Sequence, residues 1–498
     1  MLIFAKISNK LSSHTGQIRR VHQSLGQINT NEGQQRNFGQ PTPLTHPHLV
    51  SKGHVLPNIS ADELANRREK LSQLVIDAMK KKHSDIKSHM IVIPSASKSY
   101  MSEKIPYIFR QNTDFLYLSG CQEPDTCLVI NVNPEKSRHH STLFMRERDQ
   151  HSEVWDGPRT DPSEAVHVFG VDEARPVWDF SNYLQKQAKE RPTSLWYDLT
   201  LTPNETVSSA IRDYTKNTKG KVWDSPKSLI HKIRLIKSKA EIDLMQTSCD
   251  IASAAITKCM NSSQPGINEH HLLATVDYES RIRGAEFLAY PPVIAGGNRA
   301  TIIHYVNNNQ LIKDGELVLM DAGCEYHGYS SDITRTWPVN GKFSKEQRAL
   351  YEVVLSVQVA IIKMLANRVS LDKMFEEMCL LLGKGLQEIG LTPRTTSLQN
   401  TIKDAYEFCP HHVSHYLGMD VHDTALVNRN IGVQPGMIIT VEPGIYVNHL
   451  MKVPKEYQGI GIRIEDDVLI TDGEPIVLSS KCPKSIAEIE AIVTNARK

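Results

Sequence analysis

The chain has 498 residues, and its 57 Lys and Arg residues nearly balance 56 Asp and Glu residues, which leaves a formal net charge of +1. This length predicts two folded domains plus a tail, and the near-neutral charge provides no global field to recruit nucleic acid or a membrane surface. The eight cysteines include no Cys-x-x-Cys pair, which indicates a reducing compartment without a disulfide framework or zinc ribbon. No uninterrupted apolar run approaches the roughly 20 residues of a bilayer span, so we expect no membrane span.

Residues 1–38 have the composition of a mitochondrial transit peptide. The first acidic residue is Glu32, and the segment before it is rich in Ser, Gln and Asn and loosely amphipathic. A secretory signal would need a longer apolar core, and a disordered tail is the remaining alternative. We therefore expect a mitochondrial matrix protein, with a cytoplasmic pool as a further location. The four charged residues before Glu32 are all basic: Lys6, Lys10, Arg19 and Arg20.

Residues 39–58 are proline-containing and predict an extended leader, and residues 59–225 then alternate helix and strand. A helix is expected from Ser60 or Asp62 to Met79. This pattern predicts a compact α/β domain, smaller than the one that follows, and it carries no set of acids and histidines at ligand spacing. The expected strands are Met90–Ile93, Thr126–Val132, Thr142–Met145 and Leu195–Tyr197.

Residues 226–498 form the second predicted domain. A hairpin is expected in which Leu317–Asp321 pairs with Tyr329–Thr336 across a turn at His327-Gly328. Two further strand regions, Met437–Val447 and Gly459–Thr471, follow near the end of the chain, and a broken strand-like stretch precedes the hairpin at Phe287–Tyr305. The expected helices cover residues 240–260, 269–283, 344–366 and 371–390.

Four acidic residues lie within or beside these apolar strands. The proposed hairpin lets Asp321 and Asp332 point at the same place from facing strands. Glu442 is followed by Pro-Gly, which ends its strand, and Glu465 shares a strand face with Arg463. An unpaired carboxylate in such surroundings would cost several kcal/mol, whereas metal coordination removes that cost.

Histidines cluster in the same region. Three of them, His411, His415 and His422, lie within twelve residues, and His304 lies upstream in Ile303-His-Tyr305. A single buried His is more often only hydrogen-bonded than catalytic. With four carboxylates, however, one imidazole completes a site for two divalent ions of the Mn, Co, Fe or Zn type. We assign His415 to metal, and the other three to substrate binding and proton transfer.

The motifs around these residues resemble aminopeptidase P, the Xaa-Pro aminopeptidase branch of the pita-bread metallopeptidases. The resemblance covers roughly residues 58–490 and extends, through the basic leader, to the mitochondrial members of that family. Its phrases include Tyr107-Ile-Phe-Arg-Gln-Asn-Thr-Asp-Phe-Leu-Tyr, Asp-Ala-Gly-Cys-Glu-Tyr, Ser-Asp-Ile-Thr-Arg-Thr-Trp-Pro, His-Tyr-Leu-Gly-Met-Asp-Val-His-Asp, Val-Glu-Pro-Gly-Ile-Tyr and Gly-Ile-Arg-Ile-Glu-Asp-Asp.

The resemblance implies an α/β (α+β) fold in which a smaller amino-terminal domain precedes a pita-bread catalytic domain. It implies two Mn²⁺ ions, with Asp321 on one ion, Asp332 and Glu465 bridging, and His415 and Glu442 completing the site. Glu442 would also accept the proton. His304 and His422 would contact the scissile carbonyl and the intermediate. The pocket for the second substrate residue would be lined by His411, Tyr446 and Arg463.

The implied activity is hydrolysis of the first peptide bond of peptides or proteins, preferentially before proline, with trimming of imported mitochondrial proteins. The implied state is a homodimer that binds no nucleic acid. A prolidase that accepts only dipeptides is the near alternative. A methionine aminopeptidase would not need the amino-terminal domain. A non-catalytic binding protein or a metal-free creatinase-like hydrolase is disfavoured, because all five ligand positions are retained.

Overall fold

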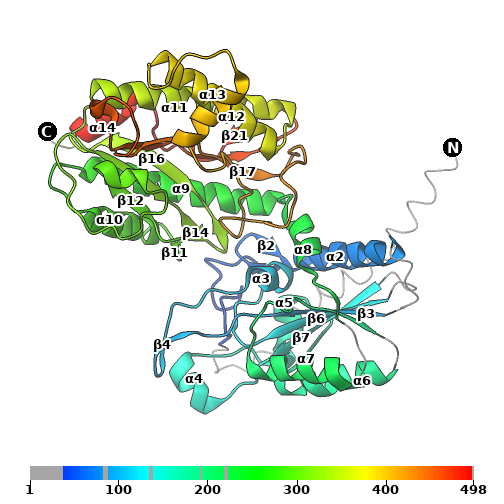
Figure 1. The fold of residues 1–498 in the computed structure, drawn as a ribbon. Coiled ribbons are helices and arrows are strands. Elements are labelled where there is room, and N and C mark those ends of the chain that lie inside the picture. The colour runs from blue at the N-terminus through cyan, green and yellow to red at the C-terminus, as the bar shows by residue number, and fades with distance from the viewer. Residues whose placement is uncertain (1–36, 82–87, 134–137, 191–192, 218–221, 496–498) are drawn as a thin grey trace, which may run out of the picture. The chain divides into compact units, whose positions relative to one another are not determined.

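The computed structural model describes residues 37–81, 88–133, 138–190, 193–217 and 222–495 (Figure 1). The predicted transit peptide therefore lies outside the described residues, except for Asn37 and Phe38. The chain divides into two compact units, Met1–Ile233 and Arg234–Lys498. The eight cysteines are free and buried, as expected for a protein without disulfides.

A six-stranded mixed sheet forms the centre of the first unit, in the order β10-β9-β3-β6-β7-β8. β3 pairs antiparallel with β6 and parallel with β9. The strand expected at Met90–Ile93 is present as β3, and every residue of β3 is buried. The strands are β3 (His89–Pro94), β6 (Cys127–Asn133), β7 (Arg138–Met145), β8 (Glu173–Pro176), β9 (Ser194–Trp196) and β10 (Val222–Asp224), and the short pairs β1 (His54–Leu56)/β2 (Ile59–Ser60) and β4 (Tyr100–Ser102)/β5 (Ile105–Pro106) lie outside this sheet.

Helices cover this sheet. Phe144 of β7 packs edge-to-face on Phe180 and Tyr183 of one helix, with ring centroids 5.1 Å apart in both pairs. The helices of the unit are α2 (Ala61–Lys81), α3 (Thr113–Ser119), α4 (Gln150–Asp156), α5 (Pro162–Phe169), α6 (Phe180–Glu190), α7 (Glu205–Asn217) and α8 (Lys227–Arg234), the last ending at the division between the units.

The second unit has strands in the middle and helices on both sides (Figure 1). Helices α9 (Lys239–Ser262) and α10 (Glu269–Arg281) lie on one side, and α11 (Lys345–Met364), α12 (Leu371–Glu388) and α13 (Leu398–Phe408) on the other. Capping boxes at Ser238/Glu241 and Ser344/Gln347 start α9 and α11. The remaining elements are β11 (Phe287–Leu288), β12 (Val293–Gly296), β13 (Leu317–Ala322), β14 (Cys324–Tyr326), β15 (Tyr329–Ser330), β16 (Ile333–Pro338), β17 (Ile438–Val441), β18 (Gly444–Val447), β19 (Ile460–Arg463), β20 (Asp466–Leu469), β21 (Ile476–Val477) and α14 (Ile486–Asn495).

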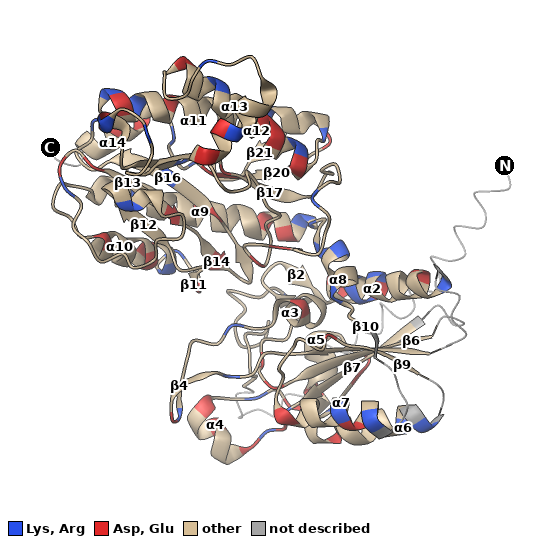
Figure 2. Cartoon of the chain, viewed as in Figure 1, with Lys and Arg blue, Asp and Glu red and all other residues tan. Residues whose placement is uncertain are grey.

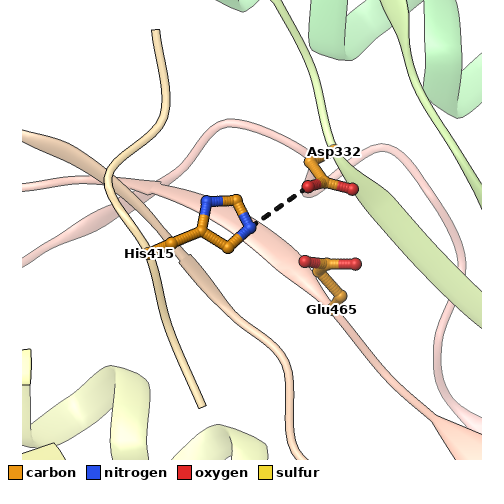
Figure 3. Close-up of side chains that lie close together, drawn as sticks. All are labelled: Asp332, His415 and Glu465. Atoms are coloured by element: carbon orange, nitrogen blue, oxygen red, sulfur yellow. Dashed lines mark ion pairs between the residues drawn. The ribbon is translucent and has the colours of Figure 1, made fainter. Parts of the chain in front are cut away.

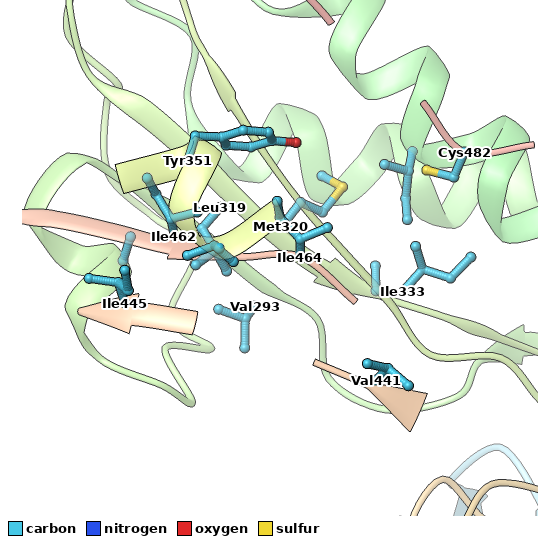
Figure 4. Packing of buried hydrophobic residues seen from close by; sticks show 14 of the residues in the cluster. Val293, Leu319, Met320, Ile333, Tyr351, Val441, Ile445, Ile462, Ile464 and Cys482 are labelled. Carbon is cyan, nitrogen blue, oxygen red and sulfur yellow. The ribbon is translucent and has the colours of Figure 1, made fainter. Parts of the chain in front are cut away.

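Apolar side chains from the sheets β12-β13-β16, β17-β20-β21 and β18-β19 pack with helix α11 in one core (Figure 4). Tyr351 of α11 is fully buried there, as are Ile462 and Ile464, the apolar side of the expected strand behind the acids. Other members of this cluster are Val293, Leu319, Met320, Ile333, Val441 and Ile445. The site described below is thus backed by a rigid apolar layer.

The expected hairpin is present, with its turn at His327 and Gly328, which both have positive φ. It consists of two strand pairs, β13/β16 and β14/β15, which belong to different sheets. The strand expectations for 437–447 and 459–471 need correction, because each of these regions breaks into two strands. Pro443 cannot donate a ladder hydrogen bond, and the amide of Glu465 donates to the carbonyl of Thr334 instead.

Helix α11, extended by a 3-10 turn to Asn367, is long and apolar enough to cross a membrane by length and composition. A core helix of a soluble protein passes the same test, and the apolar face of α11 packs in the core.

Acidic and basic residues are interspersed along the helices of each unit, in keeping with the near-zero net charge (Figure 2). Helices α13 and α14 were not predicted.

A buried ionic network joins β16 to the end of the chain. Arg335 is fully buried and donates to Asp466 at 2.7 Å and to the carbonyl of Glu465 at 2.5 Å. Its other donors reach the carbonyls of Thr334, Cys482 and Pro483. Asp466 is also bound by Lys484, Ser479 and Gln358. Burial alone would raise the pKa of Asp466, but Arg335 and Lys484 outweigh it and hold that pKa well below its usual range.

We predict that Arg335→Met lowers the free energy of unfolding by about 3–5 kcal/mol, because it leaves a buried carboxylate without its main partner. Arg348→Met is the matched control, since Arg348 forms a surface pair with Glu490 at 2.8 Å and its loss should change stability by about 0–1 kcal/mol. Urea denaturation measures both values. Equal losses in the two variants would contradict a stabilising role for the network.

Candidate metal centre

The five residues expected to bind metal come from separate elements and converge in the second unit. Asp321 lies in β13 opposite Thr334, and Asp332 directly precedes β16. Glu442 follows the end of β17, and Glu465 sits between β19 and β20. The fifth residue, His415, precedes Tyr416, which forms a β-bridge with Ile439.

Side-chain atoms of three of these residues face one another (Figure 3). One ligand atom each from Asp332, His415 and Glu465 lies within 4.8 Å of the others. The imidazole Nε2 is 3.3 Å from Asp332 Oδ2 and 3.7 Å from Glu442 Oε1. Glu442 therefore joins the group through His415.

Asp321 joins the group through a residue that the motifs did not single out. The hydroxyl of Tyr290 donates to Asp321 Oδ1 at 2.6 Å and to Asp332 Oδ1 at 2.5 Å. Burial, followed by the charges of these two carboxylates, raises the pKa of Tyr290 well above its usual value, so the hydroxyl stays protonated. The other oxygen of Asp321 accepts from Arg463 at 2.5 Å.

The cluster holds more buried carboxyl groups than cationic groups, and this imbalance shifts the pKa values of its members. Burial and the neighbouring carboxylates raise the pKa of Glu465 well above its usual value, and burial raises that of Glu442 to about 7 although His415 opposes the shift. For His415, burial disfavours the cation, but its contact with Asp332 and the charge of Glu442 outweigh this and raise the pKa to about 9. Burial raises the pKa of Asp321, against the charge of Arg463.

This donor set fits a site for divalent cations. The four acids supply oxygen ligands in a buried place, and a cation among them would remove the repulsion that raises the pKa of Glu465. The Nδ1 of His415 is 3.2 Å from the carbonyl of Tyr416. If Nδ1 keeps its proton, as this contact favours, a bound cation would replace the proton on Nε2, which is the usual arrangement of a metal-binding His.

Backbone hydrogen bonds fix each of these residues. His415 and Thr440 exchange hydrogen bonds, and the amide of Glu442 donates to the carbonyl of Val413. The amide of Asp332 donates to Asp467 Oδ2 at 3.0 Å, and Cys249 donates to the same oxygen. The cluster is thus held by pairings that lie outside its own side chains.

Three of the expected substrate residues form one chain of hydrogen bonds. Arg463 Nη1 donates to the hydroxyl of Tyr446 at 2.8 Å, and that hydroxyl lies 2.9 Å from His411 Nε2. His411 Nδ1 lies 2.9 Å from the carbonyl of His412. Burial, helped by the charge of Arg463, lowers the pKa of His411 to about 4, so this imidazole is neutral near pH 7. A neutral imidazole that accepts at Nε2 and donates at Nδ1 satisfies both contacts.

The other two histidines lie at the edge of this cluster. The ring of His422 packs edge-on against His415, with centroids 4.5 Å apart. Burial and then the charge of His415 lower the pKa of His422. His304 is exposed and lies close enough to act electrostatically on His411 and His422. All the predicted site residues therefore belong to one region of the second unit.

Three residues of the centre were not predicted to contact the acids: Tyr290, Thr334 and Asp467. Thr334 lies in a recognised motif, and its hydroxyl joins Glu465 Oε2 at 2.6 Å to Arg463 Nε at 3.1 Å. Tyr290 precedes Pro291-Pro292, a turn-like sequence that gives no reason to expect a contact with two acids. Asp467 is an acid in an apolar strand, which is a signal, but not one that names its partner.

Known protein families and individual proteins are similar to this chain over most of its length. Residues 64–196 match the family model for the aminopeptidase P amino-terminal domain, and residues 243–472 match that for metallopeptidase family M24. The chain is 45% identical over 464 residues to Xaa-Pro aminopeptidase 3 of Mus musculus, covering 92% of this chain and 90% of that protein. It is 38% identical over 467 residues to the mitochondrial intermediate cleaving peptidase 55 of Arabidopsis thaliana, covering 92% and 88%.

A solved structure is similar over both units. Zinc-substituted aminopeptidase P of Escherichia coli, in complex with product, matches with a TM-score of 0.80 at 32% sequence identity. The match covers 88% of this chain and 99% of that chain. It confirms the predicted fold class, a catalytic domain of the pita-bread type preceded by a smaller α/β domain.

We predict that Tyr290→Phe weakens binding of Mn²⁺ by about 10-fold or more, because Asp321 and Asp332 lose the hydroxyl that orients them. Tyr329→Phe is the matched control, since the buried Tyr329 hydroxyl donates to Glu241, away from the acids. Titration calorimetry measures the affinity of each purified variant. Unchanged binding in Tyr290→Phe would remove Tyr290 from the centre.

Proposed function

The chain belongs to the aminopeptidase P branch of metallopeptidase family M24 and is a metallo-aminopeptidase; we propose that it releases single amino-terminal residues, preferentially where proline is second. The identification made from the sequence motifs, with Xaa-Pro aminopeptidase 3 as a close relative, is confirmed by the identity over most of the chain. The observation that carries the proposed chemistry is the convergence of four carboxylates and one imidazole in a buried place.

The metal ligands in this proposal are Asp321, Asp332, His415, Glu442 and Glu465, and the ions are two Mn²⁺. Such a pair, when bound, polarises the scissile carbonyl and makes water a nucleophile at neutral pH. A carboxylate-rich site with a single imidazole suits Mn²⁺. Each of the five side chains is at most 17% exposed, so the reaction would take place away from bulk water.

Glu442 is our candidate for the proton acceptor. A carboxylate at this position can accept and release a proton during the reaction. Its Oε2 lies 3.9 Å from His411 Nδ1, so an imidazole stands beside the carboxylate on the side of the proposed substrate pocket. His304 and His422 would donate to the scissile carbonyl and stabilise the charge that develops on its oxygen.

We assign the pocket for the second substrate residue to His411, Tyr446 and Arg463. Their hydrogen bonds run in one direction, from the guanidinium through the phenol to the neutral imidazole. Each group is therefore satisfied without the substrate. Proline has no backbone N–H to donate. A pocket whose polar groups are already hydrogen-bonded to one another is therefore well suited to proline.

The remaining assignments concern the whole protein. We propose residues 1–38 as a mitochondrial transit peptide, 39–58 as an extended leader, 59–225 as the amino-terminal domain and 226–498 as the catalytic domain. The matched family regions lie inside the last two ranges. The substrates would be peptides and proteins newly imported into the matrix.

We also propose a homodimer. Exposed apolar side chains on β4, β5 and α4, including Met101, Ile105 and Trp155, support a surface for self-association.

Peptides that vary in length and in the second residue test the function. We expect the Mn²⁺-loaded protein to release one residue from tripeptides and longer peptides, fastest with proline second, as read by mass spectrometry. Asp332→Ala and Glu465→Ala should each lower activity by at least about 1,000-fold while the far-UV spectrum is kept. A chelator should stop turnover, and Mn²⁺ should restore it.

The control variant is Asp277→Ala, because Asp277 forms only a surface pair with Arg281 in this structure. Cleavage restricted to dipeptides would identify a prolidase instead, and binding of peptides without any cleavage would identify a non-catalytic protein. Activity retained in Asp332→Ala or Glu465→Ala would refute the ligand assignment.

Fusion of residues 1–40 to a fluorescent reporter tests the location. We expect import into mitochondria, because the segment before Glu32 is basic and free of acids. The control replaces Lys6, Lys10, Arg19 and Arg20 with Gln and should abolish import. A reporter that stays in the cytosol with the native segment would reject the transit peptide.

A further inference from the structure

A second buried carboxylate outside the metal centre, besides Asp466, accepts hydrogen bonds from four donors. Glu269 is the first residue of helix α10 and is fully buried. Its Oε1 accepts from the amide of Gly296 at 2.9 Å and from Arg299 Nε at 2.7 Å. Its Oε2 accepts from the hydroxyl of Tyr305 and the amide of Gln310, both at 2.9 Å. Four donors therefore meet on two oxygens.

All four donors belong to the segment 296–310, which leads from the end of β12 toward β13. After Gly296, the last residue of β12, and the 3-10 turn Gly297–Thr301, the segment has no helix or strand, so side chains must hold it. Asn308 supplies a second anchor, since its side chain accepts from the amide of Ile294 and donates to the carbonyl of Pro292. Glu269 holds the segment at both ends and in the middle.

The same segment carries His304. This residue is exposed, whereas the next residue, Tyr305, is 8% exposed and has its hydroxyl on Glu269. The backbone of His304 is thus fixed by its neighbour, while its side chain is exposed and acts electrostatically on His411 and His422. A loop that presents a substrate-binding group is useful only if it keeps one geometry, because a misplacement of about 1 Å can lower a rate about 100-fold.

We propose that Glu269 is a positioning residue for peptide hydrolysis, which fixes the 296–310 segment and so places His304 at the substrate. The inference rests on the role proposed above for His304. A carboxylate is required, because its two oxygens act only as acceptors. In Glu269→Gln one oxygen becomes an amide that donates, and in either orientation this amide would meet two of the four donors.

The test compares Glu269→Gln with Glu279→Gln. Glu279 lies in the same helix, is 8% exposed and pairs with Arg283 rather than with the 296–310 segment. We expect Glu269→Gln to lower kcat/KM for a proline-second peptide by about 10–100-fold with unchanged Mn²⁺ affinity by calorimetry. Glu279→Gln should remain close to wild type in both measurements.

Two further measurements separate positioning from general damage. In the His304→Ala background, Glu269→Gln should cause little further loss, because both changes act through one imidazole. Hydrogen exchange of the amides in 297–310 should accelerate in Glu269→Gln and not in Glu279→Gln. Tyr305→Phe, which removes a single anchor, should show the same pattern with a smaller effect and serves if Glu269→Gln fails to fold.

Additive losses with His304→Ala, or unchanged exchange in 297–310, would overturn the proposal. Failure of the proposed function has a different signature, in which the wild-type protein releases no residue from any peptide. In that case the role of His304 falls with the function, and the exchange difference still decides whether Glu269 holds the segment.

Discussion

The constraint on which this structure depends is the burial of four carboxylates around one point. Each acid in an apolar surrounding costs several kcal/mol unless a cation or hydrogen bond compensates it. Arg463 compensates Asp321, and His415 compensates Asp332 and Glu442. These two cations face four anions, which leaves the pKa of Glu465 raised by its neighbours. A divalent cation among these acids would supply the missing positive charge, so the repulsion that makes the unfilled site unfavourable also favours metal binding.

Two of the acids, Glu442 and Glu465, lie at positions where a strand is interrupted. β17 and β18 would be one strand, but Pro443 ends the pairing, and the chain continues in another sheet. β19 and β20 likewise separate at Glu465, whose amide turns to the carbonyl of Thr334 in β16. A carboxylate at such a break is not confined to one face of a sheet. Glu442 and Glu465 both lie where the chain crosses between the sheets β17-β20-β21 and β18-β19.

The sequence singles out these acids because the information that marks them is local. Each lies in a short motif in which an acid interrupts an apolar strand, and the order of helices and strands follows from their periodicity. The supporting contacts are different. Tyr290 meets Asp321 and Asp332 across 31 and 42 residues, and Asp467 meets the amide of Asp332 across 135 residues. No local pattern encodes such pairs, and the breaks at Glu442 and Glu465 depend on the sheet partners. Helices α13 and α14 were not predicted; both are short, with 11 and 10 residues.

The two functions of the site require different degrees of exposure. Metal ligands must be shielded, and they are held by strands and backbone pairings. In the proposed function substrate must reach His304 and His422, and both are exposed and lie on loops. Each loop is tied by a buried acid beside its histidine: Glu269 binds the segment of His304, and Asp423, directly after His422, binds Lys237 at 3.1 Å and also Arg234. A buried ion pair fixes geometry whether or not it adds net stability. The backbone that carries each exposed histidine is therefore held in one position, like the backbone of a core residue.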